Sequence, residues 1–249
     1  MRFLRLIYSL YALGIFVLCM LLVIPAVVIA SFFGKVRGGN VIYRICSYWS
    51  DVWFFMIGIR HRNLYEYPHD KNKQYIFVAN HISYLDAPVI VKTIRQKVRA
   101  LGKAEVSKVP LFGFIYRNAV VTVNRSSPAA RANSVRILKS VIRKGISIFI
   151  FPEGTFNETG KPMKALYDGA FRIAIETQTP IKPVLFLDTW RRMHYSTVFS
   201  LNAGRSRSVF LKEIPVEGLT GNDVEMLKQK VQQVMEQKLR EYKAEWIAG

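Results

Sequence analysis

The sequence contains few of the residues that build disulfide frameworks and metal centres. Its 249 residues include two cysteines and four histidines. Cys19 lies inside an apolar run and Cys46 follows soon after it, with no CxxC motif and no close pair of histidines. These features argue against a disulfide framework and a zinc site, and we expect no bound metal. Internal repeats, low-complexity tracts and long linkers are also lacking.

Acidic residues are scarce as well. The chain has 17 Asp+Glu against 36 Lys+Arg, which gives a formal net charge of +19. A protein this basic attracts anionic partners, which are phospholipid head groups, acidic soluble substrates or nucleic acid. The cations are scattered along the chain and no nucleic-acid-binding signature accompanies them. We therefore expect no nucleic-acid partner.

Apolar residues, in contrast, are abundant, and the N-terminus concentrates them. Residues 7–33 are almost wholly apolar, and as a helix they could cross a hydrocarbon layer of about 30 Å. Three interpretations fit this run: a spanning helix, a cleavable signal peptide ending near 28–30, and a hairpin or oblique helix pair buried from one side of the bilayer. The run exceeds the roughly 7 to 15 residues usual for the core of a signal peptide.

Charges on both sides of the run favour the hairpin, because the positive-inside tendency draws both ends toward the cytoplasm. They are Arg2 and Arg5 before the run and Lys35 and Arg37 after it. Gly14 and Pro25 could break the run. Residues 41–59 carry tryptophans among arginines and predict a second, interfacial helix. We therefore predict that residues 1–64 form a two-helix segment embedded in the membrane.

From about residue 65 the pattern changes to short apolar runs that alternate with amphipathic stretches, which is typical of an α/β domain. The predicted strands are 75–79, 120–123, 146–151, 184–187 and 209–211. The predicted helices are 87–94, 128–144, 169–177 and a C-terminal helix that runs from a capping box at Thr220 and Asp223 to Trp246. Residues 65–249 thus predict one α/β domain with a mixed, largely parallel sheet flanked by helices.

Polar side chains follow three of these strands, at the end of the sheet where α/β proteins collect functional groups. They lie in the segments 80–86, 124–125 and 153–155. His81 comes directly after a strand, and a histidine with an ordinary pKa near about 6.5 can act as a general base at neutral pH. A carboxylate such as Asp86 would fix the tautomer of the ring and stabilise the imidazolium that forms.

The spacing of His81 and Asp86 tests this pairing. Five residues along one helix turn through about 140°, so a continuous helix would point the two side chains apart. The pair can form only if His81 lies in a loop and Asp86 at or near the start of a helix. The same placement fits a helix cap, either Asp86 alone or a capping box with Ser83, and spacing alone favours the cap.

The segment Asn80-His81-xxxx-Asp86, followed downstream by Phe-Pro-Glu-Gly-Thr at 151–155, resembles the glycerolipid acyltransferase family, and most closely its bacterial 1-acyl-sn-glycerol-3-phosphate acyltransferases. The likeness continues through 103–113, 120–125 and 180–184 in the family's order. It covers about residues 73–187. The His-xxxx-Asp pattern is weak alone, but its combination with the Pro-Glu-Gly-Thr block is specific.

The resemblance implies a membrane-bound enzyme of phospholipid biosynthesis, with its catalytic domain on the cytoplasmic side of the bacterial inner membrane. It would transfer a fatty acyl group from acyl-CoA or acyl carrier protein to the free hydroxyl of 1-acyl-sn-glycerol-3-phosphate and release phosphatidic acid. His81 would be the base and Asp86 its partner, with no metal or cofactor. The residues implied in acceptor binding are Asn80, Lys103, Arg125, Glu153, Gly154 and Thr155.

Chemistry agrees with these assignments. An arginine such as Arg125 can offer a phosphate two parallel hydrogen bonds, although a solvated surface arginine is the plainer alternative. Glu153 could bond acceptor hydroxyls or position Arg125, and Gly154 lets the backbone approach a ligand. An ordinary turn also explains Glu153 and Gly154. Lys103 adds positive potential near the site, or is only surface charge.

The sequence departs from the family pattern at several positions. Phe156 and Asn157 stand where arginine and serine are expected, Ala119 where glycine is expected, and Tyr167-Asp168 where a basic residue is common. Three nearby cations could replace the missing charge: Lys161, Lys164 and Arg172. The alternatives are another lysolipid acceptor, a basic membrane-binding or nucleic-acid-binding protein, and a metal-dependent hydrolase that uses His81, Asp86 and His194.

Overall fold

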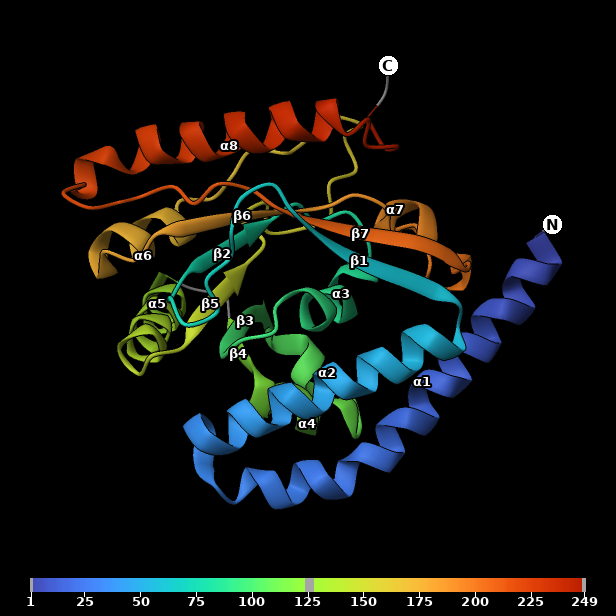
Figure 1. Cartoon of the computed structure of the whole chain (residues 1–249). Helices are drawn as coiled ribbons and strands as arrows, with labels where there is room; N and C mark the ends of the chain where they lie inside the picture. The colour runs from blue at the N-terminus through green and yellow to red at the C-terminus, as the bar shows by residue number, and fades with distance from the viewer. Residues whose placement is uncertain (1, 124–127, 248–249) are drawn as a thin grey trace.

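A seven-stranded sheet forms the centre of the computed structural model, which describes residues 2–123 and 128–247 (Figure 1). Its strand order is β1-β7-β6-β2-β5-β3-β4. Every neighbouring pair is parallel except β6 and β7. The prediction of a mixed, largely parallel sheet is confirmed. The strands are β1 Ile59–Tyr65, β2 Ile76–Ala79, β3 Val98–Lys103, β4 Val120–Val123, β5 Ser147–Ile150, β6 Ile181–Phe186 and β7 Gly204–Phe210.

Helices cover both faces of the sheet. On one face lie α5 Pro128–Arg143, α6 Gly169–Thr177 and α8 Val224–Glu241, and on the other lie α1 Arg2–Ser31, α2 Gly39–Met56, α3 Asp86–Thr93 and α4 Phe112–Ala119 (Figure 1). The short α7 Thr189–Arg192 precedes β7. Strand β2 separates two hydrophobic cores, because Phe77 packs with the α1–α4 side while Ile76 and Val78 pack with the α8 side. Its continuous apolar run suits a strand buried on both faces.

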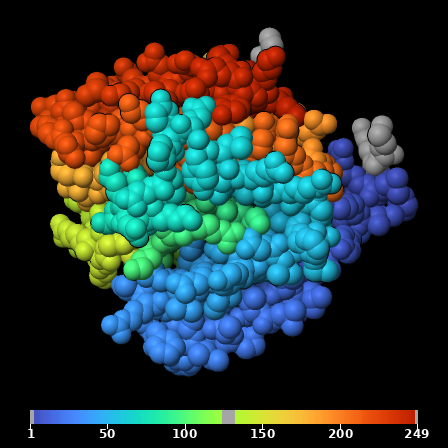
Figure 2. Space-filling model, in the orientation of Figure 1, coloured from blue at the N-terminus to red at the C-terminus, as the bar shows by residue number. Residues whose placement is uncertain are grey.

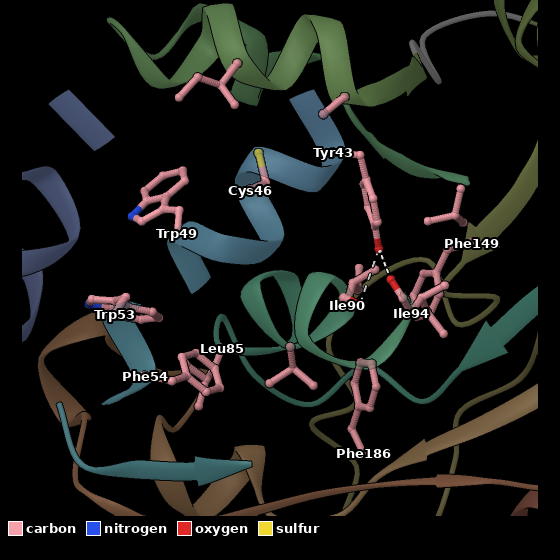
Figure 3. Close-up of a cluster of buried hydrophobic side chains, with 14 of the residues drawn as sticks. Tyr43, Cys46, Trp49, Trp53, Phe54, Leu85, Ile90, Ile94, Phe149 and Phe186 are labelled. Atoms are coloured by element: carbon pink, nitrogen blue, oxygen red, sulfur yellow. Dashed lines mark hydrogen bonds between the residues drawn. The ribbon is translucent and has the colours of Figure 1, made fainter. Parts of the chain in front are cut away.

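The N-terminal helices form a hairpin that is part of the fold. A π-helical turn, Gly34–Gly38, joins α1 to α2. The Nε1–H of Trp53 on α2 donates to the carbonyl of Ala12 on α1 at 2.8 Å. The hydroxyl of Tyr43 on α2 donates to the carbonyl of Ile94, just beyond α3, at 2.9 Å (Figure 3). Together α1 and α2 make up one side of the molecule (Figure 2).

Helix α1 is long and apolar enough to cross a membrane, and 22% of its most apolar window is buried by the rest of the protein. The helix continues through both Gly14 and Pro25, so neither of the two possible breaks in the apolar run occurs. The chain turns after Phe33 instead, where Gly34 adopts a φ of 75°. This conformation is open to glycine and costly for other residues.

Strand β1 is the main element that the sequence analysis missed. The second helix was expected to reach residue 59 and the α/β domain to begin near 65, but α2 ends at Met56 and Ile59 already pairs with Gly204 of β7. The charged Arg60 and Arg62 concealed the strand, which tolerates them because it lies at the edge of the sheet.

Other predictions agree closely with the structure. Helix α6 and strand β4 have the predicted bounds, and the capping box of Thr220 and Asp223 is present. The C-terminal helix ends at Glu241 rather than at Trp246, although Trp246 is buried in the core beneath it. Strand β3 and helix α4 were not predicted, because their segment was interpreted only as a sequence motif.

Candidate active site

The polar segments noted in the sequence gather at one edge of the sheet. Strands β2, β5 and β3 are parallel neighbours, so their carboxyl ends lie together. His81 follows the end of β2, Glu153 follows the end of β5, and Lys103 is the last residue of β3. Arg125, the predicted phosphate ligand, lies outside the described residues.

His81 and Asp86 are in direct contact. The Nδ1 atom of His81 lies 2.8 Å from Oδ2 of Asp86. The same oxygen accepts the backbone N–H groups of Ile82 at 2.7 Å and Ser83 at 2.9 Å. Asp86 is fully buried and is the first residue of α3, whereas His81 lies in the preceding loop. This is the placement that the spacing required.

The Asp86 carboxylate pairs with His81 and does not cap α3, so the pairing interpretation fits the structure and the capping interpretation does not. The Asp86 carboxylate also accepts the Ser83 N–H, but the N-cap residue of α3 is Leu85, which makes no side-chain capping bond. The bond from His81 uses the same carboxylate oxygen. Because an ionised carboxylate can only accept, the contact favours the ring tautomer with a proton on Nδ1, in which Nε2 carries none.

Aromatic side chains set the orientation of the His81 ring. Phe151 stacks on it with ring centroids 3.9 Å apart and planes 9° from parallel. Phe156 meets the ring edge-on at 4.4 Å, and Tyr84 contacts Phe156 in turn at 4.8 Å. The side chain of His81 stays 19% exposed. The ring is therefore fixed by its neighbours but open to a substrate.

Glu153 holds the backbone of the His81 loop. Its Oε1 accepts the N–H of His81 and its Oε2 accepts the N–H of Lys164, each at 2.9 Å. The N–H of Asn157 donates to the His81 carbonyl at 2.7 Å, so the peptide groups on both sides of His81 are bonded. Burial raises the pKa of Glu153 to about 7, against the opposing effect of the two N–H bonds.

Two predicted acceptor-binding side chains are thus engaged with the protein itself. Both carboxylate oxygens of Glu153 bond the backbone. The Asn80 amide is fully buried, donates to the carbonyl of Phe186 and accepts its N–H, each at 2.9 Å. Asn80 therefore joins the end of β2 to β6 and does not point into the site, contrary to the prediction of a substrate contact.

Of the remaining predicted residues, Gly154 is buried and the other two are exposed. Gly154 has a φ of 75° in the turn after β5. Thr155 is exposed, and its hydroxyl accepts a hydrogen bond from Nζ of Lys164 at 2.6 Å. Of the three cations considered as replacements for an arginine at 156, Lys164 lies at this turn, whereas Arg172 on α6 faces Asp168 at 3.5 Å. Lys103 is exposed at the end of β3.

Sequence reasoning missed the stacking of Phe151 on His81 and the backbone role of Glu153. The motif 151–155 contained both residues, but only the neighbouring placement of β2 and β5 shows what they contact. Within residues 2–123 and 128–247, no group of three His, Cys, Asp or Glu side chains could hold a metal ion.

The sequence profile of the Acyltransferase family matches residues 58–187, just over half of the chain. The chain belongs to the acyltransferase family. An uncharacterized acyltransferase of Schizosaccharomyces pombe is 30% identical over 177 residues, which are 69% of this chain and 62% of the yeast protein. A 1-acyl-sn-glycerol-3-phosphate acyltransferase of Cocos nucifera is 34% identical over 128 residues, 49% of this chain and 41% of its own length.

The acyltransferase fold extends over the whole chain. The crystal structure of the 1-acyl-sn-glycerophosphate (LPA) acyltransferase PlsC from Thermotoga maritima superposes with a TM-score of 0.78 at 22% identity, covering 99% of both chains. This likeness concerns the fold. The curated relatives are longer than the matched segments, since the chain spans 62% and 41% of the two described above.

Proposed function

We propose that the protein is a membrane-bound O-acyltransferase that acylates the free hydroxyl of 1-acyl-sn-glycerol-3-phosphate and yields phosphatidic acid. The acyl donor is a thioester of coenzyme A or of acyl carrier protein. The observation that carries the proposal is the contact between His81 and Asp86 at 2.8 Å, at the carboxyl edge of an acyltransferase-family sheet. Relatives named 1-acyl-sn-glycerol-3-phosphate acyltransferase support the choice of acceptor.

The reaction needs one base and no covalent acyl-enzyme intermediate. Nε2 of His81 takes the proton of the acceptor hydroxyl while its oxygen attacks the thioester carbonyl. Asp86 stabilises the imidazolium through the Nδ1–H bond. When the tetrahedral intermediate collapses, the carbon–sulfur bond breaks and the imidazolium returns its proton to the departing thiolate. An ester and a free thiol are formed, and His81 is neutral again.

Lys164 is our candidate for the cation that meets the acceptor phosphate. Phe156 stands where the family resemblance predicts an arginine, and the ammonium group of Lys164 lies at that turn, 2.6 Å from the Thr155 hydroxyl. The Glu153 carboxylate accepts hydrogen bonds from the backbone N–H groups of both Lys164 and His81. Lys103 adds positive charge at the same edge of the sheet.

The hairpin of α1 and α2 is the proposed membrane segment. Many side chains of α1 are apolar and exposed, among them Leu22 at 72% and Phe32, just beyond the helix, at 84%. Arg5 before the apolar run and Lys35 and Arg37 after it favour a hairpin with both ends on the cytoplasmic side. The acceptor would then reach His81 from the bilayer, and the soluble donor from the cytoplasm.

The test is an acylation assay with the full chain in phospholipid vesicles. Radiolabelled acyl-CoA and acyl carrier protein donors are offered with a panel of lysolipids, and product is measured for wild type, His81→Ala and His194→Ala. We expect activity with 1-acyl-sn-glycerol-3-phosphate, a loss of about 10²–10⁴-fold in His81→Ala, and little change in His194→Ala. Full activity of His81→Ala would refute the mechanism, and loss in His194→Ala together with inhibition by chelators would support the hydrolase-like alternative.

A further inference from the structure

The acyltransferase domain has an exposed apolar tip of its own, separate from the N-terminal hairpin. It consists of Val109, Pro110 and Leu111, which connect the 3-10 turn Ala104–Lys108 to α4. Pro110 is exposed, and the exposed fractions are 48% for Val109 and 51% for Leu111. We call these three residues the 109–111 tip.

The backbone of the 109–111 tip is strained. Leu111 has a φ of 59° and a ψ of −57°, and the N–H of Phe112 donates to the carbonyl of Pro110 at 2.6 Å. This is a γ-turn of the rare form with positive φ, in which a branched side chain crowds the backbone. Glycine would adopt it more readily. In water, the exposed Leu111 side chain buries little apolar surface that could offset this strain. An apolar environment would bury it.

Helix α4 is fastened to the hairpin at both of its ends. At the start, the Phe112 ring lies 6.1 Å from Phe16 on α1 and 6.5 Å from Trp49 on α2. At the end, Nζ of Lys35 in the hairpin turn donates to the carbonyl of Arg117 at 3.2 Å and to the side-chain oxygen of Asn118 at 3.1 Å. Figure 1 shows α4 directly behind the two helices of the hairpin. The 109–111 tip is therefore connected to the hairpin through the contacts of α4.

The charges around the 109–111 tip are positive. Lys103 and Lys108 precede it, both exposed, and Arg117 follows on α4. A single acidic residue, Glu105, lies among them. Exposed apolar side chains flanked in the chain by exposed lysines suit an anionic bilayer, in which acyl chains lie beneath phosphate head groups.

We propose that the 109–111 tip is a second membrane contact, in which Val109 and Leu111 enter the acyl region and Lys103 and Lys108 meet anionic head groups. This inference rests on the membrane role of the hairpin proposed above. Two contacts, the hairpin and the tip, would fix the tilt of the domain. The tip is joined through β3 to the sheet edge that carries His81, so this tilt sets how the site faces lysolipids in the membrane.

A fluorescent probe at Leu111 tests the inference. The native cysteines are buried, so an environment-sensitive dye attached to Leu111→Cys in a Cys19→Ala, Cys46→Ala background labels the tip selectively. The full chain is reconstituted in vesicles of phosphatidylcholine and phosphatidylglycerol. We expect a blue shift of the dye, quenching by nitroxides on the lipid acyl chains, and protection from aqueous iodide.

Two matched sites complete the experiment. Met226→Cys on α8 replaces another exposed apolar residue, 48% exposed, on the far side of the sheet, and its dye should be quenched only by iodide. Phe32→Cys reports on the hairpin. If Phe32 is inserted while Leu111 behaves like Met226, the inference is overturned and the hairpin proposal stands. If both labels remain in water, the membrane part of the proposed function fails too. None of these fluorescence measurements requires that the enzyme be catalytically active.

Leu111→Gly provides a second test, because it removes the side chain and relieves the strained turn. We expect the thermal unfolding temperature in detergent to be equal to or above that of wild type, with acylation unchanged in detergent micelles. On vesicles, acylation should fall, with a larger fall at low anionic lipid content. Equal vesicle activity of this variant and wild type would overturn the inference.

Discussion

The two long helices α1 and α8 lie on opposite faces of the same sheet and bury different fractions of their apolar side chains (Figure 1). In α8, an apolar stripe is buried in the core, and Met226 is the single apolar residue among its exposed side chains. In α1, leucine, isoleucine and phenylalanine side chains remain exposed along the helix. The outer face of α8 is polar, whereas the outer face of α1 is apolar, as is typical of a surface that binds a membrane or a partner.

The hairpin is nonetheless not a simple appendage. Trp53 and Phe54 of α2 belong to the same core as Phe77 and Phe149 of the sheet. One face of the hairpin therefore serves as protein core while the other faces outward. A helix pair with an apolar outer face can therefore still contribute to the core of the α/β domain.

Charges on the outer face of α1 should have the largest effect. Leu22 and Ile29 are 72% and 62% exposed and lie on one side of the helix, seven residues apart. Replacing both with glutamate costs roughly 2.5–3.5 kcal/mol for each charge in the bilayer, or about 5–7 kcal/mol together, so binding to vesicles should fall by about 10⁴–10⁵-fold. Vesicle flotation measures this. The matched control, Met226→Glu with Gln233→Glu on α8, should float like wild type, and equal flotation of both double variants would break the contrast between the helices.

The two cores can be compared by removing one phenyl ring from each. Phe54 of α2 and Phe171 of α6 are buried on opposite sides of the sheet, with exposed fractions of 1% and 0%. Each change to alanine should lower the free energy of unfolding by about 3–5 kcal/mol. Denaturant titration in mild detergent gives both values. A cost for Phe54→Ala far below that for Phe171→Ala would show that the hairpin adds little to the stability of the domain.

Glu153 follows strand β5 of the sheet that both cores share. Its titration should change the free energy of unfolding. Its pKa is about 7 in the folded protein against an ordinary value of 4.5, so the folded state binds the proton more tightly. Stability is then highest below about pH 4.5 with respect to this group, and it is lost as the pH rises to about 7. Glu153→Gln lacks this dependence, so unfolding free energies measured from pH 4.5 to 8 should diverge from those of wild type by about 1–3 kcal/mol. Parallel curves would contradict the raised pKa.

The smallest effect is expected for an ion pair on the α8 side. Lys139 of α5 and Glu176 of α6 are 2.5 Å apart, with side chains 30% and 44% exposed. Lys139→Ala should lower the free energy of unfolding by about 0.2–1 kcal/mol, because water screens such pairs. A double-mutant cycle with Glu176→Ala isolates the interaction. A coupling well above this range would mean that the α5–α6 contact is less hydrated than its exposure indicates.

Local patterns predicted much of the fold. The periodicity of residues 169–177 predicted α6, and the spacing of His81 and Asp86 predicted a loop followed by a helix start. Strand β1 escaped because its alternation is masked by Arg60 and Arg62, which only an edge position tolerates. The site was predicted in part. His81 and Asp86 do meet, whereas Asn80 and Glu153 bond the protein backbone in place of the predicted acceptor contacts.

The sequence by itself determined many of the helices and strands beyond residue 65, which helix is long and apolar enough to cross a membrane, and where a histidine could stand beside a carboxylate. These properties depend on spacing along a short stretch of chain. Only the tertiary structure decided that one carboxylate, Glu153, would hold the backbone N–H groups of His81 and Lys164 together. The bond from the His81 N–H to Glu153 joins residues 72 positions apart in the chain. It forms because β2 and β5 are neighbours in the sheet, which no short stretch of sequence predicts.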